Sequence, residues 1–145
     1  MKTRFSALVS LKKNAMQKSE RVVQNANKNL FNAKEALRES LAELQNIPAP
    51  QQGIISDFLA NRTLLDSQRA VISHNESWVE YAQKELLEAK EQLKRDMIEY
   101  EKFNYLELQE IEKMLQAKKL QETKDLDEVA LMTYSKKTNI IRQAS

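Results

Sequence analysis

Few side chains in this sequence could do chemistry, and their spacing does not form a site. His74 is the only histidine, and the chain has no cysteine with which it could share a metal ion or activate a nucleophile. One imidazole without close carboxylates binds transition metals poorly, so we expect His74 to lie at a surface or a partner contact. Glutamates are frequent after residue 77, but paired carboxylates need a concave pocket to act as acid and base.

Motifs for nucleotide chemistry are also absent. One glycine in 145 residues cannot build a phosphate-binding loop, and neither a serine-hydrolase nor a zinc-protease motif occurs. A net charge of +2, with aromatic residues that are not interleaved with the basic ones, argues against nucleic-acid binding. We therefore predict a protein that is not an enzyme and has no catalytic, metal-binding or cofactor-binding residue.

The composition predicts an all-α fold. Charged residues make up 30% of the chain and aromatic residues 6%, which is poor material for a globular core. The only glycine and both prolines fall within residues 48–53, so the one strong break lies about a third of the way along. No stretch approaches the ~20 apolar residues that cross a bilayer, and we read no export signal at the amino terminus.

A seven-residue apolar repeat precedes the break. Its members are Val9, Met16, Val23, Leu30, Leu37 and Leu44. This repeat is typical of a coiled-coil helix. Lys12, Ser19 and Ser40 interrupt the companion positions, so we expect loose packing at those places.

An answering repeat follows the break, with spacings of three and four residues. Its members are Val79, Ala82, Leu86, Ala89, Leu93, Tyr100 and Phe103. Only Asp96 interrupts it. The two repeats predict a long antiparallel two-helix coiled-coil hairpin.

The boundaries follow from local signals within a single domain, residues 1–145. We expect a first long helix over 1–46 and, over 47–76, the turn and one or two short helices near the closed end. Ser77 opens a sequence with capping-box spacing, which predicts a second long helix over 77–124. Asp125 could cap a further helical segment, 125–145, which we expect to fray.

The charges suggest how the arms pair. Residues 1–46 carry nine Lys or Arg against four acids, net +5, whereas 78–128 carry nine against fourteen, net −5. In a hairpin with equal arms, the basic residues near the amino terminus lie beside the basic tail. The open end would then contain Arg4, Phe5, Leu8, Lys12 and Lys13 together with Lys136, Lys137 and Arg142. We predict that this basic end, which carries both termini, contacts a partner.

The arrangement resembles the FliJ family, small coiled-coil proteins of the flagellar type III export apparatus. The resemblance covers the whole chain and rests on its length, the short break, a second helix ending near residues 126–128, and an opening pattern. That pattern is formed by Met1, Phe5, Leu8 and Leu11.

A family pattern in the middle of the chain, Phe-x3-Leu-x2-Ala-x3-His, is implicated in contact with the export gate protein FlhA. Ala70 and His74 keep its Ala-x3-His spacing, whereas Ser67 and Thr63 stand where the pattern has Leu and Phe. With Leu65 close by, the resemblance implies a gate contact around Leu65, Ala70 and His74.

The resemblance also implies a shape similar to the γ stalk of rotary ATPases. The basic end would enter the hexameric export ATPase, FliI, and the protein would link that ring to the gate, with export chaperones as possible further partners. It would be cytoplasmic and reach the inner-membrane face of the flagellar base through partners only. The alternative is a structural or chaperone coiled coil unrelated to export, such as a prefoldin-like clamp, which Phe5, Leu8 and Leu11 keep open.

Overall fold

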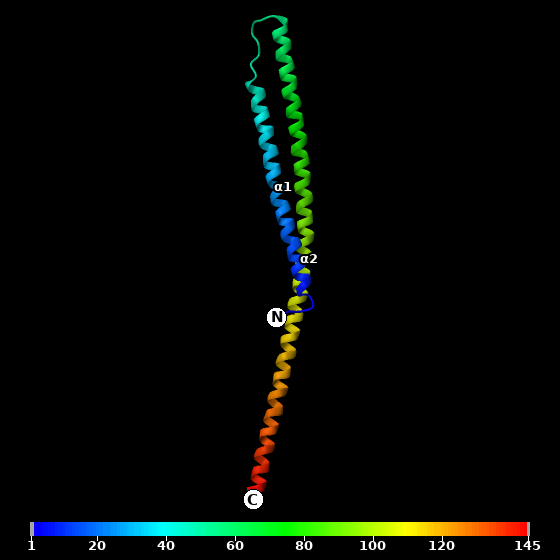
Figure 1. Cartoon of the computed structure of the whole chain (residues 1–145), viewed down its shortest axis with the longest axis vertical. Coiled ribbons are helices and arrows are strands. Elements are labelled where there is room, and N and C mark those ends of the chain that lie inside the picture. The colour runs from blue at the N-terminus through cyan, green and yellow to red at the C-terminus, as the bar shows by residue number, and fades with distance from the viewer. Residues whose placement is uncertain (1, 145) are drawn as a thin grey trace. The chain divides into compact units, whose positions relative to one another are not determined.

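Two long helices make up the regular structure of the described chain. The computed structural model describes residues 2–144, with side chains through residue 143, so residues 1 and 145 of the predicted segments lie outside it. Helix α1 spans Ser6–Asn46 and helix α2 spans Ile55–Ala144 (Figure 1). The prediction of an all-α hairpin, with two long helices packed against each other, is confirmed.

Helix α2 is longer than the sequence signals indicated. It begins at Ile55 and continues without a break to Ala144, so the expected short helices over 47–76 are its first turns. Ser77 and Asp125 both lie inside it. A capping side chain marks a helix start only where the backbone before it is not helical. No Gly or Pro after residue 53 interrupts the helical backbone at Ser77 or Asp125.

The turn lies where the prolines and glycine predicted it. Asn61 Nδ2 donates a hydrogen bond to the Pro48 carbonyl oxygen at 2.7 Å, which ties the turn to the start of α2. Gly53 has a φ of 149°, a conformation that other residues rarely adopt. A Cβ atom there would also lie 2.6 Å from a carboxylate oxygen of Asp57, which would have to move, but it is the positive φ that favours a glycine in this turn.

The chain divides into two compact units, one of residues 12–99 and one combining residues 2–11 with 100–144. In the first unit, α1 and α2 run antiparallel, from blue to cyan and from green to yellow-green in Figure 1. The core of this unit is thin. Its buried residues are Ser19, Ala26, Ala33, Ser40, Ile72, Asn75, Ala82 and Ala89.

Small residues recur every seven positions on both helices of this unit. On α1 they are Ser19, Ala26, Ala33 and Ser40, and on α2 they are Asn75, Ala82, Ala89 and Asp96. The members of the larger apolar repeat predicted for α1 that fall in this unit, from Met16 to Leu44, are half-buried beside them. Small side chains let two helix axes approach closely, and the larger ones then close the seam at its sides.

A hydrogen bond fixes the register of the two columns of small residues. The Ser19 hydroxyl donates to the Asp96 carboxylate across the seam. In an antiparallel pair, a step of seven residues up α1 corresponds to a step of seven residues down α2. One such step from Ser19 and Asp96 pairs Ala26 with Ala89, and a second step pairs Ala33 with Ala82. Ala33 is 0% exposed and Ala82 is 3% exposed, as expected for residues at this closest approach.

The polar residues that seemed to weaken the seam are therefore paired. Asp96 accepts a second hydrogen bond from Gln92 Nε2 at 3.1 Å. Nearer the turn, Asn75 Nδ2 donates to the Ala36 carbonyl oxygen at 3.2 Å, and Gln68 Nε2 donates to the Ser40 carbonyl oxygen at 2.8 Å. These bonds satisfy the buried groups and hold the register in place of apolar packing.

In the second unit, the first turns of α1 lie against α2 near residues 103–111. Beyond them α2 continues alone within this unit, as the orange and red ribbon of Figure 1 shows. Every described side chain from 112 to 143 is exposed except Thr138, which is half-buried. A helix without a packed face owes its stability to propensity alone and is marginal in water.

Candidate functional site

The first turn of α1 is held by its own side chains. The Phe5 backbone N–H donates to Thr3 Oγ1 at 3.1 Å, and the Thr3 backbone N–H donates to Ser6 Oγ at 2.8 Å. The Thr3 hydroxyl thus accepts from the Phe5 N–H and the Ser6 hydroxyl from the Thr3 N–H, while the Ser6 N–H donates to the Thr3 carbonyl oxygen at 3.2 Å. These hydrogen bonds hold the backbone segment from which the side chains of Arg4 and Phe5 extend.

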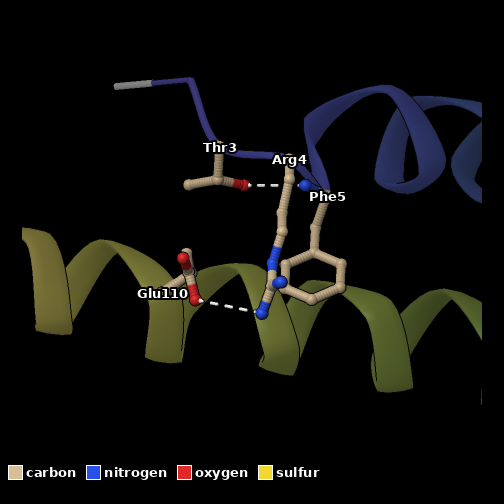
Figure 2. A network of polar contacts seen from close by, with 4 residues as sticks. All are labelled: Thr3, Arg4, Phe5 and Glu110. Carbon is tan, nitrogen blue, oxygen red and sulfur yellow. Dashed lines mark hydrogen bonds and ion pairs between the residues drawn. The ribbon is translucent and has the colours of Figure 1, made fainter.

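Two polar contacts join this turn to α2 in the same unit. Arg4 Nη2 lies 3.8 Å from Glu110 Oε2, and its guanidinium carbon lies 4.9 Å from the centre of the Phe5 ring (Figure 2). The Ser6 hydroxyl donates to Glu107 Oε1 at 2.8 Å. Since the Arg4 side chain is 74% exposed, its ion pair is worth at most about 1 kcal/mol. The contacts place the start of α1 level with residues 107–110 of α2.

The basic residues of the tail are not brought beside the amino terminus. Lys136, Lys137 and Arg142 all lie on the exposed end of α2. Lys136 is 26 residues beyond Glu110, which at 1.5 Å per residue is about 39 Å along the helix. The expectation of one basic end carrying both termini is therefore wrong.

The unequal helix lengths explain this difference. Helix α1 has 41 residues, whereas α2 has 90 and starts directly after the turn. An antiparallel partner that begins at residue 55 meets the start of α1 near residue 110, so the last turns of α2 extend past it.

The remaining predicted ring-contact residues have different surroundings. Leu8 is 39% exposed and belongs to the same unit as Arg4. In the other unit, Lys12 Nζ lies 3.6 Å from Glu99 Oε2, and Lys13 is exposed. The Lys12 and Arg4 ion pairs join a basic α1 to an acidic part of α2, as the segment charges indicated.

The three residues of the predicted gate contact do not share one face. Leu65 is half-buried and lies seven residues before Ile72 in the column that faces α1. Ala70 and His74 are exposed and four residues apart, so they lie next to each other on the outer surface of α2.

Two aromatic residues missed by the sequence reasoning extend this outer surface. His74, Ser77, Trp78 and Tyr81 line a hollow of about 450 Å³. The Tyr81 side chain is 63% exposed and that of Trp78 is 38% exposed. The signal was available, because Trp78 and Tyr81 follow His74 by four and seven residues and so share one helical face. This face borders the seam, since Trp78 and Tyr81 also line a hollow with Val22 and Asn25 of α1. We call His74, Trp78 and Tyr81 the aromatic face.

The described residues offer no arrangement for metal chemistry. Among residues 2–144, no group of three or more His, Asp or Glu side chains is placed to hold a metal ion. Over the same range, neither helix has a stretch apolar and long enough to span a membrane.

Comparison with known proteins shows the family of this chain. The model of the family described as "Flagellar FliJ protein" matches residues 1–139. Among solved structures, a putative YscO homolog from Chlamydia trachomatis is similar, with 21% identity, 93% of this chain and 96% of that chain covered, and a TM-score of 0.44. No curated protein matches. Because the family model covers nearly the whole sequence, this chain belongs to the FliJ family, non-catalytic components of the flagellar type III export apparatus.

Proposed function

We propose that this protein binds the hexameric export ATPase, FliI-like, and links it to the export gate, FlhA-like, at the cytoplasmic side of the flagellar base. The free end of α2 would contact the ring, and the surface of Ala70 and His74 would contact the gate. The exposed faces of both helices would leave room for export chaperones.

The observation that carries this proposal is the last part of α2. It is a single exposed helix, and residues 129–145 contain Lys136, Lys137 and Arg142 but no acidic residue. A helix with its side chains is about 10–12 Å wide, narrow enough to enter the centre of a protein ring. Its positive charge suits a ring that presents acidic or polar groups.

Ring contacts by Arg4, Phe5, Leu8, Lys12 and Lys13 stay a prediction, which this proposal does not require. Arg4 and Lys12 already bind glutamates of α2. A ring that contacted them would have to displace those glutamates or bind around them.

Stimulation of ATP hydrolysis tests the ring contact. We expect the variant Lys136→Glu/Lys137→Glu to stimulate the purified hexamer much less than the parent chain does. Lys84→Glu/Lys90→Glu is the matched control, because it makes the same charge change at two exposed positions of α2 in the other unit. Equal stimulation by the tail variant and the control would refute the ring contact.

Capture of the gate's cytoplasmic domain tests the second contact. We expect His74→Ala and Ala70→Glu to weaken capture, because both side chains lie on the outer surface of α2. Glu80→Ala, an exposed substitution on the same helix, serves as the control. Capture that is indifferent to changes at both positions would count against the gate contact.

A further inference from the structure

The seam next to the aromatic face contains a groove between α1 and α2. It has a volume of about 440 Å³ and lies wholly within the unit of residues 12–99. Ala26 and Ala82 line it and are buried, so they form its base. Val22, Trp78 and Tyr81 border it with exposed side chains. The small residues of the seam thus leave a hollow between the larger side chains on either helix.

The polar lining of this groove carries a negative charge. It consists of Glu85 on α2 with Asn25 and Asn29 on α1, and among the described residues no lysine or arginine lines the groove. Glu85 is exposed and makes no ion pair within residues 2–144. The groove therefore combines two aromatic rings with a carboxylate that has no cation beside it.

The sequence of α1 explains why Glu85 is left without a cation. Val22 and Asn29 line the groove on α1, and Ala15 and Ala36 continue their seven-residue spacing in either direction. None of these four residues is charged. Residues that flank a coiled-coil seam commonly pair lysine on one helix with glutamate on the other. Because α1 supplies no lysine along this side, a cation from outside the chain can pair with Glu85.

An arginine side chain matches these groups. Its planar guanidinium stacks on an aromatic ring while its N–H groups donate to a carboxylate, whereas a lysine ammonium has no planar surface to stack. Tyr81 and Glu85 are four residues apart, so they are neighbours on the surface of α2. The amide oxygens of Asn25 and Asn29 can accept further hydrogen bonds. The aliphatic part of the arginine would lie over the alanines at the base.

We propose that the groove at Trp78, Tyr81 and Glu85 binds an arginine side chain presented by a partner protein. From residue 78 to residue 85 the groove extends about 10 Å along α2, which suits one long side chain rather than a whole helix. The contact goes beyond the proposed function, because neither Ala70 nor His74 nor the basic tail lines the groove. It would favour partners that place an arginine here over those that place an acidic residue, which Glu85 repels.

Tryptophan fluorescence tests the binding directly, because Trp78 is the only tryptophan of the chain. The probe is N-acetylarginine amide, and the control is N-acetylcitrulline amide, which has nearly the same shape but no charge. At constant ionic strength we expect the arginine probe to change the fluorescence saturably, with half-saturation on the order of 1–10 mM. The citrulline probe should bind at least about tenfold more weakly. A response that does not saturate, or an equal response to both probes, would overturn the proposal.

Removal of one charge tests the role assigned to the carboxylate. Glu85→Gln keeps the shape of the side chain but not its charge, so it should weaken binding of N-acetylarginine amide about tenfold. Glu88→Gln is the matched control, because Glu88 is an exposed acid on the same helix that does not line the groove. Its affinity should equal that of the parent chain. Equal affinities of the two variants would refute the pairing with Glu85.

A cation built into the chain tests the site by competition. Asn29→Lys places a lysine at the groove, so we expect the saturable response to N-acetylarginine amide to be lost. Asn32→Lys makes the same charge change at an exposed position of α1 outside the groove and should bind as the parent chain does. Circular dichroism should show equal helix content in both variants. Equal binding by both variants would overturn the proposed site. None of these substitutions alters Ala70, His74 or the basic tail, so failure here leaves the proposed ring and gate contacts standing.

Discussion

The two parts of α2 differ in what their seven-residue repeats contain. Between residues 72 and 96, the helix carries a column of small residues that meets a like column on α1, and the contact buries both. Beyond residue 111 the helix is exposed and has no such column. The comparison teaches that small residues in register mark the closely packed, buried part of this helix and are absent from its free part.

The largest expected effect comes from a substitution where α1 and α2 approach each other most closely. Ala33→Leu adds a large side chain where exposure is 0%, so it should lower the free energy of unfolding by about 1–3 kcal/mol, measured by urea denaturation. Ala42→Leu, at an exposed position of α1, should change it by less than about 0.5 kcal/mol. Similar losses in both variants would contradict the alanine seam.

The next effect concerns the bond that sets the register. Asp96→Ala leaves the Ser19 hydroxyl buried without its acceptor and should cost about 1–2 kcal/mol of unfolding free energy. Adding Ser19→Ala removes the unsatisfied group, so the double variant should lose less than the sum of the two single losses. Strict additivity in the double-mutant cycle would show that the two side chains do not interact.

A smaller effect is expected where α1 begins. Arg4→Ala removes an exposed ion pair and should cost less than about 1 kcal/mol. The change should be local, so amide hydrogen exchange should rise in the first turns of α1 and stay unchanged between Ala26 and Ala33. Lys13→Ala, an exposed change on the same helix, is the control and should alter neither region.

The smallest effect depends on pH. Arg38 Nη2 donates to Glu35 Oε2 at 2.9 Å, which lowers the pKa of the Glu35 carboxyl, first through the hydrogen bond and then through the charge. This carboxylate therefore stabilises the fold above its unfolded pKa, and the contribution disappears as pH falls through the folded value. Carboxyl NMR titration should show the lowered pKa, and Arg38→Ala should return it towards the ordinary value.

Much of the fold was readable from the sequence, since the apolar columns and the single Pro/Gly turn predicted two packed helices. The start of α2 was missed because Gln68 and Asn75 occupy seam positions there and conceal the repeat that leads from Leu65 through Ile72. Their amides bind backbone carbonyls of α1, a role that hydropathy does not reveal. Polar seam residues thus looked like interruptions when they were partners.

The candidate site was less predictable than the fold. The residue types at both ends were identified, but joining Arg4 to Lys136 required the length of each helix, and the assumption of equal arms gave the wrong register. The aromatic face was missed because a helix start was expected at Ser77. That start placed His74 in one segment and Trp78 and Tyr81 in another. Without that start, Trp78 and Tyr81 share one helical face with His74 and line a hollow with it.

The central claim is that α2 extends well beyond the start of α1. Its most direct test is a pulsed EPR distance between spin labels at Ala7→Cys and Lys136→Cys, two exposed positions of one unit, in a spin-diluted sample. The account predicts a separation of about 40–45 Å, from 1.5 Å per residue along α2. A distance below about 20 Å, as in a hairpin whose ends meet, would contradict it.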